Sequence, residues 1–364
     1  MNPSNRVIRV LVADDSSLAR GLLRAILEDE AGIEVIAEAR HGREAVEMAR
    51  DLKPDIITMD LNMPVMDGMQ AISEIMHQKA IPILVVSNES DAEKAYEALR
   101  LGALEVISKP DYTPEQAAEF IAKIRLLAGV PVITHLRRRW GPDSVPFVAE
   151  PPLSGQYGAA PRGYNRVLVI ASSTGGPQAL ACLLPKLSVN FPAPILIAQH
   201  ISDGFVEGMV HWLGSLCQLP VKVAQQGEVL RPGQVYVSPS EQHLTLAANH
   251  SVTLIERQMS DIYRPSCDLL LNSVARHCGA DAIGLILTGM GRDGAAGMLA
   301  MYQAGGITLA QDEASSVIYG MNQEAVNRGG VLRVLPLDAL ADELQRVVSL
   351  PASVYREHLT RGES

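Results

Sequence analysis

Short, nearly continuously apolar runs alternate with helical patterns of apolar residues along most of this chain. Between residues 6 and 129 the predicted strands are residues 7–13, 34–39, 55–60, 81–87 and 105–108. Segments between them, such as residues 18–28 and 42–51, carry the apolar spacing that favours helices. Strands that are apolar on both faces and separated by helices are typical of a parallel sheet covered on both sides. We therefore predict a five-stranded parallel α/β domain over residues 1–129.

The same alternation resumes after residue 165, with predicted strands at residues 166–172, 194–200, 281–289 and 306–312. Helical patterns cover residues 177–187, 205–216, 266–278 and 295–303. Three further apolar runs, residues 234–239, 244–248 and 251–256, lie close together in the way that antiparallel hairpins do. We predict a doubly wound α/β domain with a mixed sheet over residues 166–350, followed by a C-terminal tail of residues 351–364.

Residues 130–165 separate the two predicted domains and carry neither pattern. Proline and glycine are frequent there and no apolar period survives, which is typical of a linker. A chain of 364 residues is also long enough to build two hydrophobic cores. We predict an interdomain linker. The alternative is an irregular extension that Trp140, Phe147 and Tyr157 anchor on one domain.

Charge and cysteine content disfavour several classes of protein. The formal net charge of -10 argues against binding to nucleic acid, which a basic face would favour, and no basic helix-turn-helix pattern appears. The four cysteines show no C-x-x-C spacing, so neither zinc nor disulfides are indicated. No signal peptide is recognisable, and no apolar run reaches the roughly 18 residues of a membrane span. We expect a cytoplasmic protein that binds no nucleic acid and does not insert into the membrane.

Polar residues follow the predicted strands of the first domain where each strand ends: Asp14, Asp15, Asp60, Ser87 and Lys109. The carboxyl ends of parallel strands meet at one edge of a sheet, so these side chains are expected to gather there. Crowded carboxylates repel one another unless a cation or phosphate chemistry uses them, and three carboxylates suit Mg2+. The alternative is that Asp14 and Asp15 cap a helix and Ser87 is an ordinary turn residue.

Two serines, Ser172 and Ser173, end a predicted strand of the second domain, where a small-residue turn leads into a helix. A hydroxyl at such a turn is exposed and firmly held. Gly175 and Gly176 let the backbone pass close to a ligand, and amides at a helix start can stabilise an oxyanion. The segment is neither a P-loop nor G-x-S-x-G. A phosphate-cradling turn or a simple helix cap explains this segment, taken alone, equally well.

His200 and Asp293 follow two further predicted strands at the same edge, which favours a catalytic interpretation. A hydroxyl needs a base to become a nucleophile, and that base needs an acid to fix its tautomer. Among the other histidines His243 is the main rival, and we expect it to be peripheral. Asp268 and Asp281 compete for the role of the acid, but Asp281 begins a strand and Asp268 lies within a helix start.

The first domain resembles the response-regulator receiver family through VADDS, MDLNMPVMDG, VVSN and ISKP. The resemblance implies a flavodoxin-like switch in which Asp60 accepts a phosphoryl group as an acyl phosphate. It assigns Mg2+ to Asp14, Asp15, Asp60 and the backbone of Asn62, and contacts with the phosphoryl oxygens to Ser87 and Lys109. One position departs from the family, because Val106 stands where many receivers carry an aromatic switch residue.

Residues 166–341 resemble the catalytic domain of the chemotaxis protein-glutamate methylesterases through ASSTGGP, AQH, VSPSEQHL, RPSCD and LTGMGRDG. That family joins a receiver to this domain in the same order, so the resemblance covers nearly the whole chain. By motif, Ser173 is the nucleophile, His200 the base and Asp293 the orienting acid. The residues assigned to the oxyanion region are Thr174 and Met290, and the departures from the family pattern are Cys267, Arg292 and Asn322.

The resemblance implies hydrolysis of glutamate γ-methyl esters on methyl-accepting chemoreceptors, with deamidation of receptor glutamines as a second activity. No cofactor is expected for the esterase step. Phosphorylation of Asp60 by a sensor histidine kinase is expected to relieve repression of the esterase, and the protein is expected to be monomeric. Two alternatives stay open: a noncatalytic response regulator whose second domain docks on partners, and a hydrolase of some other protein or small ester.

Overall fold

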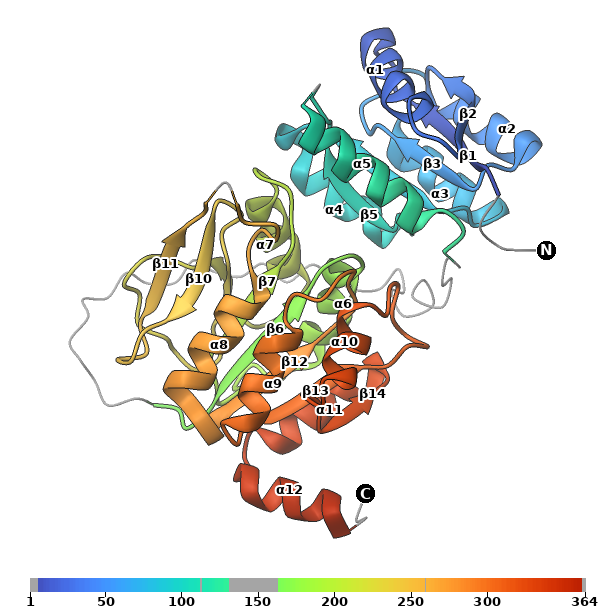
Figure 1. The fold of residues 1–364 in the computed structure, drawn as a ribbon. Helices are drawn as coiled ribbons and strands as arrows, with labels where there is room; N and C mark the ends of the chain where they lie inside the picture. Colours follow the sequence, from blue (N-terminus) through green and yellow to red (C-terminus); the bar gives the residue numbers. More distant parts are fainter. Residues whose placement is uncertain (1–5, 112, 131–162, 259, 362–364) are drawn as a thin grey trace. The chain divides into compact units, whose positions relative to one another are not determined.

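The computed structural model describes residues 6–111, 113–130, 163–258 and 260–361 (Figure 1). The chain divides into two compact units, and the boundary between them falls within residues 131–162, outside the described residues. The predicted linker of residues 130–165 lies almost wholly in that stretch, as do Trp140, Phe147 and Tyr157. Its role as a linker therefore stays a prediction.

The first unit is a five-stranded parallel sheet with strand order β2-β1-β3-β4-β5. All five strands lie where the sequence predicts them: β1 (Ile8–Ala13), β2 (Ile33–Ala39), β3 (Ile56–Met59), β4 (Ile83–Ser87) and β5 (Glu105–Ser108). The helices between and after them are α1 (Ser17–Glu28), α2 (Gly42–Leu52), α3 (Gly68–Gln78), α4 (Ala92–Arg100) and α5 (Pro114–Leu127).

Helices cover both faces of this sheet. Leu27 of α1 and Phe120 and Ile124 of α5 share a buried core with Val10 and Val12 of β1. Successive strand residues point to opposite faces, so the residues between these valines face the other side, where α2 packs on α3. The strands are therefore buried, and their carboxyl ends open at one edge of the sheet.

The second unit is built on a seven-stranded, wholly parallel sheet with strand order β14-β13-β12-β6-β7-β9-β8. Its strands are β6 (Val167–Ser172), β7 (Ile195–Gln199), β8 (Val221–Val223), β9 (Val235–Val237), β12 (Ala282–Ile286), β13 (Ile307–Gln311) and β14 (Arg333–Leu335). Its helices are α6 (Gly176–Leu183), α7 (Val206–Leu216), α8 (Cys267–Cys278), α9 (Ala295–Gln303), α10 (Met321–Asn327), α11 (Leu337–Val347) and α12 (Ala352–Arg361).

The antiparallel strands differ from the mixed sheet that the sequence predicts. Only β10 (Gln242–Leu246) and β11 (Val252–Glu256) form a hairpin, and they make a separate two-stranded sheet. The neighbouring run, β9, instead joins the main sheet in parallel with β7 and β8. β9 is buried along its whole length, as a central strand requires, whereas β11 becomes exposed towards its end. The hairpin packs on α8 beside the main core.

Strand order in the second unit reverses at β6. The chain continues from β6 to β7 on one side and later returns to place β12 on the other side. Ligands of open α/β sheets bind at such a switch point, outside the carboxyl ends of the strands. The ends of β6, β7 and β12 therefore mark the expected position of a site.

Residues 351–364, set apart by sequence as a tail, contain α12. Tyr355 of this helix is fully buried, and its hydroxyl donates to Glu343 of α11 at 2.5 Å. The packing of α12 makes it part of the second unit. No helix among the described residues is long and apolar enough to cross a membrane.

Candidate functional sites

The charged residues of the first unit come together at the carboxyl edge of its sheet. Asp14 follows β1 and Asp60 follows β3, and the Asp60 N–H donates to the Ala13 carbonyl at 2.8 Å. Lys109, just after β5, places Nζ 2.7 Å from Asp14 Oδ2 and 3.2 Å from Asp60 Oδ1. Asp14 and Asp60 are buried, whereas Asp15 is exposed. Three strand ends thus concentrate these charges in one pocket.

Burial and charge act together on the central groups of this pocket. Burial raises the pKa of Asp60, and the charge of Asp14 adds to that rise while Lys109 partly opposes it. Burial of the ammonium group lowers the pKa of Lys109, but its hydrogen bond to Asp14 and the two carboxylate charges outweigh this and raise it overall. One lysine thus faces more than one carboxylate, so the pocket can accept further positive charge.

The residues present fit the predicted Mg2+ site. Carboxylate oxygens of Asp14, Asp15 and Asp60 all lie within 4.8 Å of one another, close enough to share one cation. Oxygen ligands of this kind suit a hard ion that keeps several waters. The Asn62 side chain donates to Asp91 Oδ2 at 2.7 Å, so it is engaged elsewhere, and this agrees with the backbone ligand assigned to Asn62.

Ser87 ends β4, and its buried hydroxyl has no hydrogen-bond partner within the part of the chain that the structure describes. Lys109 lies beside it, because the Lys109 N–H donates to the Ser87 carbonyl at 3.0 Å. A buried hydroxyl without a partner is rare and fits an oxygen-rich group held between these residues. The helix-cap alternative for Asp14 and Asp15 does not hold, because the Ser16 hydroxyl caps α1.

The two serines of the second unit differ in what holds them. Ser172 is the last residue of β6, and its buried hydroxyl donates to Gln199 Oε1 at 2.7 Å. Gln199 donates in turn to the carbonyls of Ser173 and His200, at 2.9 and 2.7 Å. Gly176 leaves space for this amide, since a Cβ there would lie 3.0 Å from Gln199 Cδ. The Ser172 hydroxyl is therefore engaged by Gln199, whereas the Ser173 hydroxyl makes no hydrogen bond among the described residues.

Strand register places Ser173 and His200 at neighbouring strand ends. Ser172 lies opposite Gln199 in the pairing of β6 with β7, and the His200 N–H donates to the Ser172 carbonyl at 3.1 Å. On the other side, a Cβ on Gly289 would lie 2.7 Å from Ser173 Cβ. The glycine after β12 is therefore required by the close approach of the serine turn.

His200 and Asp293 form a hydrogen-bonded pair across this edge. His200 follows β7, Asp293 lies between β12 and α9, and His200 Nε2 is 2.8 Å from Asp293 Oδ2. An ionised carboxylate only accepts hydrogen bonds, so Nε2 carries a proton and Nδ1 is left as the basic nitrogen. No hydrogen bond joins Ser173 to His200 within the described ranges, and such contacts often tighten only when substrate binds.

Four donors hold the buried Asp293 carboxylate at the amino end of α8. Besides His200, the N–H groups of Cys267 and Asp268 donate at 2.6 and 2.9 Å, and the Ser266 hydroxyl donates at 3.2 Å. Burial alone would raise the pKa of Asp293, but the hydrogen bond and charge of His200, together with the backbone donors, lower it overall. Asp293 therefore stays ionised beside the imidazole.

The rival acids have other places in the fold. Asp268 Oδ1 accepts from the N–H groups of Gly294 and Gly297, at 3.0 and 2.7 Å, so this carboxylate caps the start of α9. Asp281 is exposed at the amino end of β12, away from the edge that carries His200. Neither carboxylate makes a hydrogen bond to His200 among the described residues.

His243, the rival base, forms a second histidine–carboxylate pair. Its side chain is buried, Nε2 lies 2.9 Å from Asp261 Oδ2, and Nδ1 accepts from the Ser266 N–H at 2.9 Å. Since Ser266 also donates to Asp293, His243 supports the segment that holds the acid. This is the peripheral role expected from the sequence.

Thr174 and Met290 lie on the two turns next to Ser173. Thr174 is buried, and its carbonyl accepts from the Thr288 hydroxyl at 2.9 Å. Met290 is 48% exposed, and its backbone N–H makes no hydrogen bond within the described residues. An available amide beside the nucleophile is what an oxyanion site needs.

Two residues of the site, Gln199 and Tyr263, are not among those predicted from the sequence. The Tyr263 ring stacks on His200 with centroids 5.2 Å apart and an interplanar angle of 13°. Both residues adjoin the quoted motifs, since Gln199 is the middle residue of AQH and Tyr263 directly precedes RPSCD. The motifs draw attention to these positions, but a stacking partner or a buried amide clamp is recognisable only in three dimensions.

Of the three departures from the family pattern, one is exposed and two are fully buried. Arg292 is exposed. Asn322 is buried and donates to the carbonyls of Ile286 and Gln311, at 3.2 and 2.9 Å, so it ties the ends of β12 and β13 together. Cys267 is buried, with Sγ 3.6 Å from His200 Nε2.

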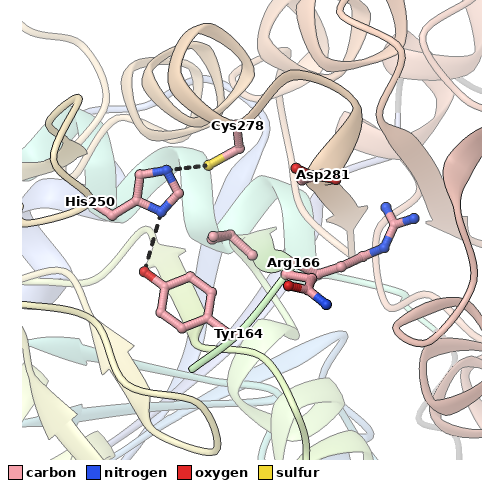
Figure 2. A pocket seen from close by; sticks show the side chains of 7 residues that line it. Tyr164, Arg166, His250, Cys278 and Asp281 are labelled. Carbon is pink, nitrogen blue, oxygen red and sulfur yellow. Dashed lines mark hydrogen bonds between the residues drawn. The ribbon is translucent and has the colours of Figure 1, made fainter. Parts of the chain in front are cut away.

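A cavity of about 410 Å³ lies at the other end of the second unit's sheet. Figure 2 shows Tyr164 and Cys278 on either side of His250, with Arg166 and Asp281 opposite them. Val167 and Asp281 place this cavity at the amino ends of β6 and β12. Because chemistry in open parallel sheets collects at the carboxyl ends, we do not assign the catalytic site to it.

Fold and sites together define the class of the protein: a hydrolase unit joined to a receiver-type unit. Family models support both parts, since the response regulator receiver domain matches residues 10–122 and the CheB methylesterase matches residues 168–344. The chain belongs to the family of protein-glutamate methylesterases/protein-glutamine glutaminases that carry a receiver domain. It is therefore a carboxylic ester hydrolase by family.

Similar proteins span nearly the whole chain. It is 50% identical over 346 residues to protein-glutamate methylesterase/protein-glutamine glutaminase 3 of Paramagnetospirillum magneticum, covering 95% of this chain and 97% of the relative. Enzyme 2 of Anaeromyxobacter dehalogenans is 44% identical over 348 residues, covering 94% and 98%. The solved catalytic domain of the Thermotoga maritima CheB methylesterase is 36% identical, covers 50% of this chain and 98% of that domain, and has a TM-score of 0.49.

Proposed function

We propose that this protein is a phosphorylation-activated esterase that hydrolyses glutamate γ-methyl esters on methyl-accepting chemoreceptors during chemotaxis adaptation. Deamidation of receptor glutamines is a second activity of the same site, because both reactions transfer an acyl group to water. The observation that carries the proposal is the hydrogen-bonded His200–Asp293 pair at the strand end next to Ser173. The family to which the chain belongs supplies the ester and amide substrates.

The reaction starts with attack of Ser173 Oγ on the ester carbonyl, while His200 Nδ1 takes the hydroxyl proton. The C–O bond to the methoxy group then breaks, and the imidazolium returns this proton to the leaving group, which departs as methanol. Water next attacks the acyl-enzyme with His200 again acting as base, and Ser173 and the glutamate side chain are released. Every proton taken by the imidazole is returned, so the enzyme ends as it began.

Three further residues support this cycle. Asp293 Oδ2 accepts the hydrogen bond from His200 Nε2 at 2.8 Å and stabilises the imidazolium that forms. The Met290 N–H and Thr174 lie next to the nucleophile and stabilise the oxyanion of the tetrahedral intermediate. No cofactor takes part in this step.

The first unit regulates the second. Asp60 accepts a phosphoryl group from a sensor histidine kinase, and Ser87 and Lys109 bind the phosphoryl oxygens through the buried hydroxyl and the ammonium group. Asp14, Asp15 and Asp60 would hold Mg2+, with the backbone of Asn62 as a further ligand. When bound, Mg2+ neutralises charge on the transferred phosphoryl group. The protein acts in the cytoplasm and as a monomer.

Matched serine variants test the catalytic assignment. Ser173→Ala, still folded, should lose methanol release from methylated receptors by at least about a thousandfold. Ser172→Ala should keep most of the turnover, because its hydroxyl only holds Gln199. Wild-type methanol release in Ser173→Ala would overturn the proposal. Release that is lost only in Ser172→Ala would assign the nucleophile to Ser172 instead.

A further inference from the structure

Three metal-ligating atoms converge on the base of the catalytic pair. His200 Nε2, Cys267 Sγ and a carboxylate oxygen of Asp293 all lie within 4.8 Å of one another. Cys267 Sγ is 3.6 Å from His200 Nε2, and Asp293 Oδ2 is 2.8 Å from the same nitrogen. An imidazole, a thiolate and a carboxylate are the three kinds of side chain that bind zinc in proteins.

The separations match the geometry of a zinc site. With Zn–S near 2.3 Å and Zn–N near 2.0 Å, two ligands on a tetrahedral ion are about 3.5 Å apart, and the thiol and imidazole are already 3.6 Å apart. The corresponding nitrogen–oxygen separation is about 3.3 Å, so the 2.8 Å His200–Asp293 contact would open by about half an ångström. The third separation, from Cys267 Sγ to the carboxylate oxygen of Asp293, is within 4.8 Å.

We propose that Zn2+, or another soft divalent cation of its class, binds His200, Cys267 and Asp293 and reversibly inhibits the hydrolase. The ligand set differs from the oxygen-only pocket around Asp60, which suits a hard ion. Soft thiolate and imidazole ligands favour zinc over Mg2+. The two units of one chain thus select different metals, one for regulation and one for inhibition.

Inhibition follows from the change in which atoms of the site carry protons when the metal binds. On binding, the Cys267 thiol releases its proton to water and the S–metal bond forms. The imidazole stays neutral, but its nitrogen Nε2 is now a ligand, so its one proton moves to Nδ1. A protonated Nδ1 cannot accept the Ser173 proton, and Asp293 no longer orients the ring. The nucleophile therefore has no base while the metal is bound.

Access to these ligands is from the His200 side. The His200 side chain is 14% exposed, whereas Cys267 is fully buried and its thiol donates to the Ala198 carbonyl at 3.4 Å. On this proposal the cation enters at the histidine, whose Nε2 is 3.6 Å from the sulfur.

Co2+ tests binding without relying on activity. The full-length protein, freed of metal, should give the near-ultraviolet absorption of a cobalt–thiolate bond on addition of Co2+, and an oxygen-only site cannot produce that band. Cys267→Ala should lose the band, and Cys267→Ser, of nearly unchanged volume, should lose it too. Cys217→Ala is the matched control, because that buried thiol donates only to the carbonyls of Leu213 and Leu219 among the described residues.

Zn2+ inhibition is measured on the same variants, each against its own metal-free rate of methanol release. Half-inhibition should need at least tenfold more Zn2+ in Cys267→Ala and Cys267→Ser than in the wild type or Cys217→Ala. A cobalt–thiolate band that survives without Cys267, no band in the wild type, or equal zinc sensitivity of all variants would overturn the proposal. The absorption readout stands even if the esterase assignment fails, so the two proposals are tested separately.

Discussion

Asp293 is the residue on which the geometry of the catalytic pair depends. Its carboxylate accepts from the His200 ring and from three donors at the start of α8, and its pKa is lowered despite burial. The same α8 donors that keep it ionised also fix its position, so the imidazole has one orientation. The amino end of α8 thus stabilises the negative charge of the proposed catalytic acid.

Replacement of the acid should be visible in both turnover and stability. Asp293→Asn is expected to lower kcat for methanol release by about 10³ to 10⁴-fold, because the amide no longer fixes the imidazole tautomer or its cation. Hydrogen bonds to a charged group contribute about 1.5–3 kcal/mol, so unfolding at neutral pH should also become easier by roughly that amount. Denaturant titration together with the methanol assay measures both effects.

The pH dependence of that stability loss has a defined sign. Because the folded-state pKa of Asp293 is lowered, its contribution is present above the unfolded-state pKa and disappears as pH falls through the folded-state value. The difference between wild type and Asp293→Asn should therefore be largest near neutral pH and shrink below about pH 4. A difference that grows on acidification would contradict the assigned charge state.

Much of the candidate site is predictable at the residue scale, but the choice between the two serines is not predictable from local pattern. Strand ends and residue types are enough to propose Asp14, Asp60 and Lys109 as one pocket. Ser172 and Ser173 share the same local pattern, and only the pairing of β6 with β7 shows that Gln199 engages the first of them. Such a contact depends on which strands become neighbours.

Among the elements, the turn after β12 shapes the nucleophile. Gly289→Ala should place a methyl group against Ser173 Cβ and Met321 Sδ, an overpacking that costs about 1–3 kcal/mol. If the serine moves in response, methanol release should fall by about tenfold or more. Gly214→Ala in α7 is the control, because the nearest atom to a new Cβ there is 4.0 Å away and alanine favours helix. Equal turnover of both variants would mean that the turn does not position Ser173.

The segment between β11 and α8 places Tyr263 on the His200 ring. Aromatic pairs contribute about 0.5–1.5 kcal/mol beyond burial. Tyr263→Ala should therefore lower kcat by up to about tenfold, because the His200 ring loses the stacking contact that orients it. Tyr263→Phe keeps the ring and should retain most of the wild-type rate. Loss of activity in Tyr263→Phe comparable to that in Tyr263→Ala would assign the effect to the hydroxyl instead of the stack.

Element types were more predictable than their partners. Every strand of the first unit lies where apolar runs predict it, and α7, α8 and α9 match their predicted ranges within a residue or so. The predicted mixed sheet is wrong in detail, because three adjacent apolar runs do not show which of them pair with each other. β9 crosses into the main sheet, and only β10 and β11 form a hairpin. The sequence also does not show that α12 packs on the second unit, because the burial of Tyr355 is seen only in the structure.

At the scale of the whole molecule, two self-contained units carry two different chemistries. The Asp60 pocket concentrates charge that a phosphoryl group and Mg2+ would alter, and the proposed acyl-transfer site lies at Ser173 in the other unit. Val106, which stands in place of an aromatic switch residue, is buried in β5. If phosphorylation of Asp60 changes this unit as proposed, we expect the change to involve another side chain or the loops around Ser87 and Lys109.

Methanol release from methylated receptors, measured with and without a small phosphodonor and Mg2+, tests the coupling of the two units most directly. The wild-type rate should rise on phosphorylation, Asp60→Ala should stay at the basal rate, and Ser173→Ala should be silent in both conditions. Asp51→Ala, which removes an exposed carboxylate paired with Arg50, should respond like the wild type. Equal wild-type rates with and without the phosphodonor, or activation that persists in Asp60→Ala, would contradict a phosphorylation-controlled hydrolase.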